Sequence, residues 1–522
     1  MPQPQDEHHA RRRGGEKLSY VLLFILLFLL PARSFQHGFH YQDLVIAFRH
    51  PSRNTKGFCT GVEKNYVLPQ FEFLAALNTS QCSTFAKSLA LRPFFHSSTI
   101  PFYSIRYGDD IVGPYFTKDL ADVSRRCILT YGLFHLLAAG KNPSDTAASA
   151  CKASNSKGYN HKKGMFSTTI PKYSLSTKLG KRWRVGVVGV SDQNEEILLS
   201  SRQKENAVNA FQPFLHGTAG LDPTLRQLDE RGPPPELDFF IFIFPKCGQV
   251  LLCLRLAQGP GTGKGYTFAS KPRRPRSGVL KALAAYREKA TFISPTAMDP
   301  ELAWVMNNMG GVRKRSRVFD PFMGSGSLLF TASLLGAEEL FGSDAAQELM
   351  GGESRVNKQL IIKSFAYDKN DFSQWVDSLT SPVPVLTQAD ILSRQLHPLF
   401  RSGYYDSIVT DPPYNIKAKV FGKAETATDT KAATARQQTI IPVIFALIDI
   451  AASVLVPGGR LVFFLPEWTK QDIGCNKKSD ANILSYMLSR TPKAFKVVFT
   501  LPQTFSPSFT RWLVCLEKSV NE

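Results

Sequence analysis

The segment Thr410–Asn415, which reads TDPPYN, places residues that can do chemistry directly after an apolar run, Ser407–Val409. The apolar run is typical of a short buried strand. Because proline lacks an N–H and fixes φ, Pro412 and Pro413 must end that strand and hold the chain stiff and extended. A carboxylate, a rigid carbonyl and an aromatic ring therefore meet at the C-terminal end of a strand, where they can accept hydrogen bonds beside a stacking surface.

A second group of candidate residues begins at Asp320, which ends a strand expected over 317–320. A glycine-rich turn, Pro321–Ser327, leads from this strand into a helix expected over 328–336. Glycines let the backbone approach a ligand, and the N–H groups at the start of a helix favour an anionic group such as a carboxylate. Strand, glycine turn and helix together indicate a nucleotide-binding type of turn.

Two more acids follow expected strands. Asp344 comes after a strand expected over 339–342, and Asp390 comes after another over 384–389. Asp344 lies roughly twenty residues beyond the first acid, a spacing that suits a hydrogen bond to a ribose diol. A single acid at such a position is most often a helix cap. A series of acids at successive strand ends, with Asp411 as its last member, favours a nucleoside cleft instead.

The elements that position these acids predict an α/β fold with a doubly wound parallel sheet. A fifth strand is expected over 461–465, and an antiparallel hairpin over 495–501 and 512–516 forms the edge of the sheet. Ligands of such sheets bind at the carboxyl ends of the parallel strands. We therefore expect Asp320 and Asp411 to line the same edge.

The N-terminal half predicts an α+β domain, with a mobile insertion at 141–178 that is poor in apolar residues. Strands are expected over 43–48, 182–190, 237–244 and 250–256, and helices over 69–77, 117–140 and 194–214. A glycine-rich segment near its end, Gln258–Gly265, resembles a phosphate-binding loop. It lacks the first glycine and the final Ser or Thr of that motif, so we expect no ATP binding.

Composition favours a nucleic-acid partner. The 522 residues include 63 Lys plus Arg against 43 Asp plus Glu, which gives a net charge of +20. A basic linker is expected over 271–289, and its candidate phosphate-binding residues are Arg273, Arg274, Arg276, Lys281 and Arg287. A solvated linker is the alternative. The eight cysteines include no CxxC pair, so we expect neither a zinc site nor a disulfide framework.

Residues 1–40 are expected to be an apolar leader or a disordered tail. A basic stretch, an apolar run over 20–30 and small residues beyond it resemble a secretory or organelle-targeting leader at 11–34. An upstream extension of the gene model is the alternative. The apolar run is too short for a comfortable membrane span, so no stable membrane association is expected. The cysteine pattern favours a cytoplasmic protein.

Two motifs carry a resemblance to a known family. DPFMGSGS at 320–327 and DPPY at 411–414 resemble S-adenosylmethionine-dependent amino-methyltransferases. Residues 292–302, with Asn307 and Asn308 next, are similar to a block of the tRNA guanosine-10 N2-methyltransferases. The resemblance covers 286–518 well and implies S-adenosylmethionine as cofactor, tRNA as substrate, a THUMP-related RNA-binding domain at 41–270 and a Rossmann-like methyltransferase domain at 290–522. It also implies a small zinc-ribbon activator protein.

The resemblance implies roles for individual residues. The cofactor-binding set is Thr296, Asp320, Pro321, Gly324, Ser325, Gly326, Ser327, Asp344 and Asp390; the catalytic set is Asp411, Pro412, Pro413 and Tyr414. An exocyclic base amine is a poor nucleophile, because its lone pair is delocalised into the ring. Asp411 and the Pro412 carbonyl would accept its N–H groups and direct the lone pair, while Tyr414 would stack on the flipped base.

The sequence departs from the family at two places and leaves two alternatives open. Ser325 and Ser327 replace the usual residues of the glycine turn conservatively, and Ala345 follows Asp344 where the family tends to have another acid. The first alternative is N6-methylation of adenine in DNA or RNA, which uses the same tetrapeptide. The second is a catalytically inactive RNA-binding scaffold, against which the intact acids argue.

Overall fold

The computed structural model describes the parts of the chain that carry the two sheets and most of the predicted site. The described residues are 44–48, 58, 67–78, 90–93, 102–106, 114–155, 181–190, 196–197, 199–226, 235–259, 279, 283, 297–345, 383–393, 399–414, 429–468, 483–506 and 508–520. The predicted leader, the five basic linker residues and Thr296 lie outside them. All described residues belong to one compact unit, Asp43–Glu522. The domain boundaries given above stay predictions.

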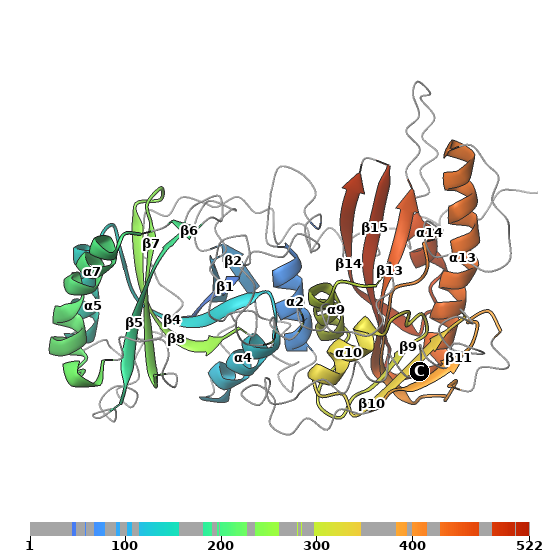
Figure 1. Ribbon diagram of the computed structural model, residues 1–522, viewed down its shortest axis with the longest axis horizontal. Coiled ribbons are helices and arrows are strands. Elements are labelled where there is room, and N and C mark those ends of the chain that lie inside the picture. Colours follow the sequence, from blue (N-terminus) through green and yellow to red (C-terminus); the bar gives the residue numbers. More distant parts are fainter. Residues whose placement is uncertain are drawn as a thin grey trace, which may run out of the picture. The chain divides into compact units, whose positions relative to one another are not determined.

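An eight-stranded sheet is built from the first half of the chain, in the order β2-β3-β1-β4-β8-β7-β5-β6 (Figure 1). Its strands are β1 (Leu44–Phe48), β2 (Ala90–Pro93), β3 (Phe102–Arg106), β4 (Thr130–Gly140), β5 (Trp183–Val190), β6 (Glu196–Ile197), β7 (Leu237–Phe244) and β8 (Gln249–Gln258). Neighbouring strands pair antiparallel except β5 and β7, which are parallel. Helices α2 (Val67–Asn78), α4 (Pro114–Arg126), α5 (Pro143–Asn155) and α7 (Ser201–Ala210) complete the predicted α+β character.

Two predicted helices of this half were wrong in part. The helix expected over 117–140 ends at Arg126, and its second part is β4, which pairs with both β1 and β8. A central strand reads as a continuous apolar run, which periodicity cannot tell from a buried helix. The helix expected over 194–214 is α7 preceded by β6, because Ser200 caps the helix by accepting a hydrogen bond from the Gln203 N–H.

The predicted mobile insertion was wrong for residues 143–155, which form α5. Asn142 Oδ1 accepts a hydrogen bond from the Asp145 N–H at 2.9 Å, at the start of this helix. Ala147 and Ala150 are buried in a hydrophobic cluster against the sheet. Small side chains let the helix pack closely without a strongly apolar face, which is why composition alone indicated a loop.

A seven-stranded sheet is built from the second half, in the order β11-β10-β9-β12-β13-β15-β14 (Figure 1). Its strands are β9 (Arg317–Asp320), β10 (Glu339–Asp344), β11 (Val385–Gln388), β12 (Tyr405–Thr410), β13 (Leu455–Trp468), β14 (Phe495–Ser506) and β15 (Phe509–Lys518). The first five strands in this order pair parallel, and β15 joins β13 and β14 antiparallel. The predicted doubly wound sheet with an antiparallel edge hairpin is confirmed.

Helices cover both faces of this sheet. Val318 packs in the cluster that includes α9 (Pro300–Met309) and α10 (Ser327–Leu334), and its neighbour Phe319 packs in the cluster that includes α13 (Asp429–Val454) and α14 (Ile483–Arg490). The alternation follows the period of two of a strand buried on both sides. Among the described residues, no helix is both long enough and apolar enough to cross a membrane.

A buried polar contact joins elements of the two halves. The Glu72 side chain of α2 is fully buried and accepts hydrogen bonds from the N–H groups of Ile128 and Leu129, at 2.8 and 2.9 Å. It also accepts one from Asn308 Nδ2 of α9, at 2.7 Å. Trp304 of the same helix donates its indole N–H to the Arg126 carbonyl, at 2.8 Å. Helix α9 is therefore held by α2 and α4 as well as by α10.

Candidate active site

The glycine turn after β9 has a backbone that only glycine adopts without strain. Gly324 and Gly326 have φ of 50° and 81°, and a Cβ on Gly324 would meet no atom within 4 Å. Gly326 is the N-cap of α10 and supplies no side-chain cap. The open space beside Gly324 and the uncapped helix start together form a place where an anionic group can meet backbone N–H groups.

Strand β10 holds this turn in place. The Met323 N–H donates to the Ser343 carbonyl at 3.0 Å, and the Gly324 N–H donates to Asp344 Oδ2 at 3.0 Å. Asp344 was predicted to bind a ribose. In the structure its Oδ2 accepts the hydrogen bond that holds the glycine turn against β10. Ser325 and Ser327 are buried, with 2% and 4% of their surface exposed.

Asp320 is a buried carboxylate with one unpartnered oxygen. Only 1% of the residue is exposed, and its Oδ1 accepts hydrogen bonds from the Thr410 hydroxyl at 2.6 Å and the Phe322 N–H at 3.1 Å. Its Oδ2 has no hydrogen-bond partner. Burial raises the pKa of Asp320 to about 7, and the carboxylates of Asp344 and Asp411 add to the rise. A cationic ligand group would satisfy Oδ2 and favour the ionised form.

The segment after β12 places Asp411 beside Tyr414. The Tyr414 hydroxyl donates to Asp411 Oδ1, and Arg511 Nη1 donates to the Tyr414 oxygen at 2.9 Å. The same nitrogen lies 3.9 Å from Asp411 Oδ2. Burial raises the pKa of Asp411, opposed by the Arg511 guanidinium and by the Tyr414 hydrogen bond. Pro412 is buried and Pro413 half-buried.

The four predicted acids end four adjacent strands. Asp390 follows β11, Asp344 ends β10, Asp320 ends β9 and Asp411 follows β12, in the order of the sheet. Asp390 lies at the outer strand, where its Oδ1 accepts a hydrogen bond from the Leu392 N–H at 3.0 Å. The prediction that Asp320 and Asp411 line one edge is confirmed by the sheet order. Among the described residues, no group of three or more His, Cys, Asp or Glu side chains could hold a metal ion.

Sequence reasoning missed Arg511, on β15. Its Nε donates to Gln503 Oε1 of β14 at 2.6 Å, and its guanidinium carbon lies 3.8 Å from the centre of the Phe464 ring. The hairpin was predicted, but its second strand was expected to begin at Trp512, three residues after the observed start at Phe509, which left Arg511 in the connecting loop. A charged residue at the margin of an apolar strand was the signal available.

A row of aromatic side chains begins at Tyr414. Tyr414 lies 6.3 Å from Phe509, and Phe509 lies 5.4 Å from Trp468 and 5.6 Å from Phe505, measured between ring centres. Phe505 is 56% exposed. Carboxylate acceptors, a buried cation and a row of aromatic rings can therefore receive a planar, hydrogen-bonding group.

The part of the chain that carries the four acids of the candidate site matches a known protein family. Residues 287–438 match the model of a family described as RMKL-like, methyltransferase domain. This part of the chain is similar to a methyltransferase domain. The glycine turn, the acids that follow β9 to β12 and the start of α13 all lie within the matched residues, so we call 287–438 the methyltransferase-like segment.

Curated relatives carry the name tRNA (guanine(10)-N(2))-methyltransferase. The protein TRMT11 of Bos taurus is 30% identical over 206 residues, which cover 35% of this chain and 41% of the relative. That of Dictyostelium discoideum is 30% identical over 240 residues, covering 44% and 42%. The chain thus spans about two fifths of the length of the relatives it matches. Among solved structures, TrmN from Thermus thermophilus is similar at 15% identity and a TM-score of 0.34, covering 91% of this chain and 99% of that one.

Proposed function

We propose that the protein transfers a methyl group from S-adenosylmethionine to the N2 amine of a guanosine in tRNA, at position 10. The observation that carries this proposal is a pair of carboxylates at the ends of adjacent parallel strands: that of Asp320, which is buried, and that of Asp411, which is half-buried. One has an unpartnered oxygen beside a glycine turn, and the other adjoins a rigid proline carbonyl and an aromatic ring. The position-10 assignment rests on the names of the curated relatives.

The described residues fit the methionine end of the cofactor. Asp320 Oδ2, buried and unpartnered, suits the α-ammonium group, and the uncapped start of α10 at Gly326 suits the carboxylate. We assign the ribose to Asp344 and Asp390 on their place at the strand ends. When bound, the cofactor supplies a methyl group whose bond to sulfur breaks, with its electron pair staying on sulfur, as the amine lone pair forms the new bond to carbon.

Asp411 prepares the amine for this transfer. Its carboxylate and the Pro412 carbonyl accept the two N–H groups, which localises the lone pair on nitrogen and stabilises the positive charge that develops there. After the new bond forms, the nitrogen loses one proton, for which Asp411 is the acceptor. Tyr414 supplies a ring face for the base, which must leave its helix to reach the site.

We assign tRNA recognition to the N-terminal half and to the basic residues Arg273, Arg274, Arg276, Lys281 and Arg287. The net charge of +20 and the names of the relatives support this assignment. The small zinc-ribbon activator and the cytoplasmic location stay predictions from the resemblance and the sequence.

The decisive experiment is methylation of an unmodified tRNA transcript with isotope-labelled cofactor, followed by mass spectrometry of the nucleosides. We expect N2-methylguanosine, and no product from a matched transcript with adenosine at position 10. N6-methyladenosine as the product would contradict the substrate assignment and favour the adenine alternative. Tight RNA binding with no product from any transcript would favour the inactive scaffold.

Cofactor affinity is expected to depend on pH through Asp320. The ammonium group binds the ionised carboxylate, and burial holds the pKa of Asp320 at about 7 before binding. Affinity should therefore approach its plateau near pH 8 and fall about tenfold between pH 8 and pH 6. Calorimetry with S-adenosylmethionine measures this directly.

Two controls make the assignment specific. Asp320→Asn should bind the cofactor weakly at every pH, without the acid limb. Adenosine, which lacks the methionine end, should bind the wild-type protein with little change between pH 6 and 8. A flat profile for S-adenosylmethionine in the wild type would show that Asp320 does not meet the ammonium group.

A further inference from the structure

We propose that Arg511 is a positioning residue for the transfer reaction: its guanidinium holds the Tyr414 hydroxyl, and through it the Asp411 carboxylate, in the arrangement that receives the amine. The inference rests on the proposed function and adds a residue outside the methyltransferase-like segment. Arg511 lies 97 residues beyond Tyr414 in sequence, on the edge hairpin.

The hydrogen bonds divide the two oxygens of Asp411 between protein and substrate. Tyr414 donates its hydroxyl to Oδ1 and accepts from Arg511 Nη1 at 2.9 Å. Oδ2 lies 3.9 Å from the same nitrogen, which is close enough for charge attraction and too far for a hydrogen bond. Oδ2 therefore keeps its capacity to accept an N–H from the amine.

Arg511 is itself held from several sides. The residue is 9% exposed, pairs in register with Gln503 of β14 and Pro466 of β13, and donates Nε to the fully buried Gln503 side chain. Its guanidinium also lies 3.8 Å from the centre of the Phe464 ring, a cation–π contact. A cation fixed in this way restricts the Tyr414 hydroxyl to one position.

The charges around Asp411 explain why a cation is needed there. Burial opposes the ionisation of Asp411. The carboxylates of Asp411 and Asp320 also repel each other, and Asp344 repels Asp320 in the same way. Arg511 and the Tyr414 hydrogen bond act in the opposite direction. Burial raises the pKa of Tyr414 far above its usual range, so its hydroxyl remains a donor. Without Arg511, Asp411 should take up a proton at higher pH and lose its strength as an acceptor.

A purely structural arginine would behave differently. Its loss would lower stability and reduce the transfer rate by the same factor at every pH. A positioning residue that keeps Asp411 ionised would instead move the acid limb of the rate profile. The pH profile therefore separates the two roles.

The test compares Arg511→Gln and Arg511→Lys with the wild type in single-turnover methyl transfer at saturating cofactor and tRNA. We expect the acid limb of Arg511→Gln to move up by about one pH unit or more, which is about tenfold in rate on that limb. Arg511→Lys keeps the charge and should restore the acid limb. Its rate at the plateau should stay low, because an ammonium group lacks the planar guanidinium whose donors hold the Tyr414 hydroxyl in place.

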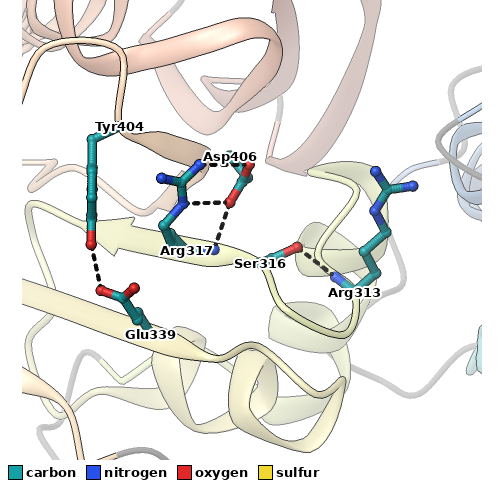
Figure 2. A network of polar contacts seen from close by, with 6 residues as sticks. All are labelled: Arg313, Ser316, Arg317, Glu339, Tyr404 and Asp406. Carbon is teal, nitrogen blue, oxygen red and sulfur yellow. Dashed lines mark hydrogen bonds and ion pairs between the residues drawn. The ribbon is translucent and has the colours of Figure 1, made fainter.

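Arg317→Gln is the matched control. Figure 2 shows Arg317 paired with Asp406 at the start of β9, the end of the strand opposite Asp320. This variant also removes an arginine from an arginine–aspartate pair, and its pH profile should match the wild type. An unchanged acid limb in Arg511→Gln, or an equal loss at every pH, would overturn the proposal.

A measurement without substrate separates this inference from the proposed function. The carboxyl pKa of Asp411 can be followed by carbon NMR, with the signal assigned by its loss in Asp411→Asn. We expect a higher pKa of Asp411 in Arg511→Gln and a smaller rise in Tyr414→Phe, which keeps the cation. If Arg511→Gln does not fold, Tyr414→Phe provides the test. An inactive wild type would refute the proposed function alone, whereas an unchanged Asp411 pKa in both variants would refute the role of Arg511.

Discussion

Asp411→Ala is expected to lower the single-turnover rate of methyl transfer by about 10²–10³, because it removes a fixed acceptor from the nitrogen where positive charge develops. Asp411→Asn keeps the shape and one acceptor oxygen but loses the charge, so its rate should fall by nearly as much. Cofactor affinity should barely change in either variant, since Asp411 meets the amine and not the cofactor. Both quantities are measured at pH 8, where Asp320 is ionised, by rapid quench and by calorimetry.

Asp344→Ala is the reciprocal control. Its oxygen fastens Gly324 of the glycine turn, at 3.0 Å, so its loss should weaken cofactor binding chiefly. At saturating cofactor the variant should recover most of the wild-type rate. A variant of Asp411 that lost cofactor affinity while keeping its saturated rate would show that the roles of the two acids were assigned the wrong way round.

Glu72→Ala is expected to lower the free energy of unfolding by about 3–5 kcal/mol. The substitution leaves three buried donors without their acceptor: the N–H groups of Ile128 and Leu129, and Asn308 Nδ2. Each buried donor left unpaired costs about 1–3 kcal/mol. Urea unfolding followed by circular dichroism measures the change.

Glu205→Ala is the matched control for this loss, because Glu205 is exposed on α7. Its effect should stay within about 0.5 kcal/mol. Glu72→Gln keeps an acceptor oxygen, so its loss of unfolding free energy should lie between those of Glu72→Ala and Glu205→Ala. A Glu72→Ala protein as stable as the control would mean that water replaces the lost acceptor.

The sheet edge that carries the acids was predictable because its signals are local. Each acid follows a short expected strand, and Asp320 and Asp411 are each followed by a proline, which ends a strand. The right-handed crossovers of parallel sheets then limit the strand orders that are possible. The prediction thus reached Asp320, Asp344, Asp390 and Asp411.

What escaped prediction depends on contacts between distant residues. Both faces of strand β4 are covered, with Leu133 in one hydrophobic cluster and Phe134 in another, so its apolar run carries no alternation that would distinguish it from a helix. Arg511 reaches Tyr414 only through the register of β15 against β13 and β14. No spacing within the sequence encodes that register, because it is set when the hairpin packs on the sheet.

The burial of α9 has a consequence for modularity. All ten residues of this helix are buried, and it is held on one side by α10 and on the other through Glu72 and Arg126. A fragment cut at the expected basic linker would expose the indole of Trp304 and the amide of Asn308 to water and leave Glu72 without a partner from α9. Exchange of one half for that of a diverged relative at that linker would therefore place unmatched side chains against α9.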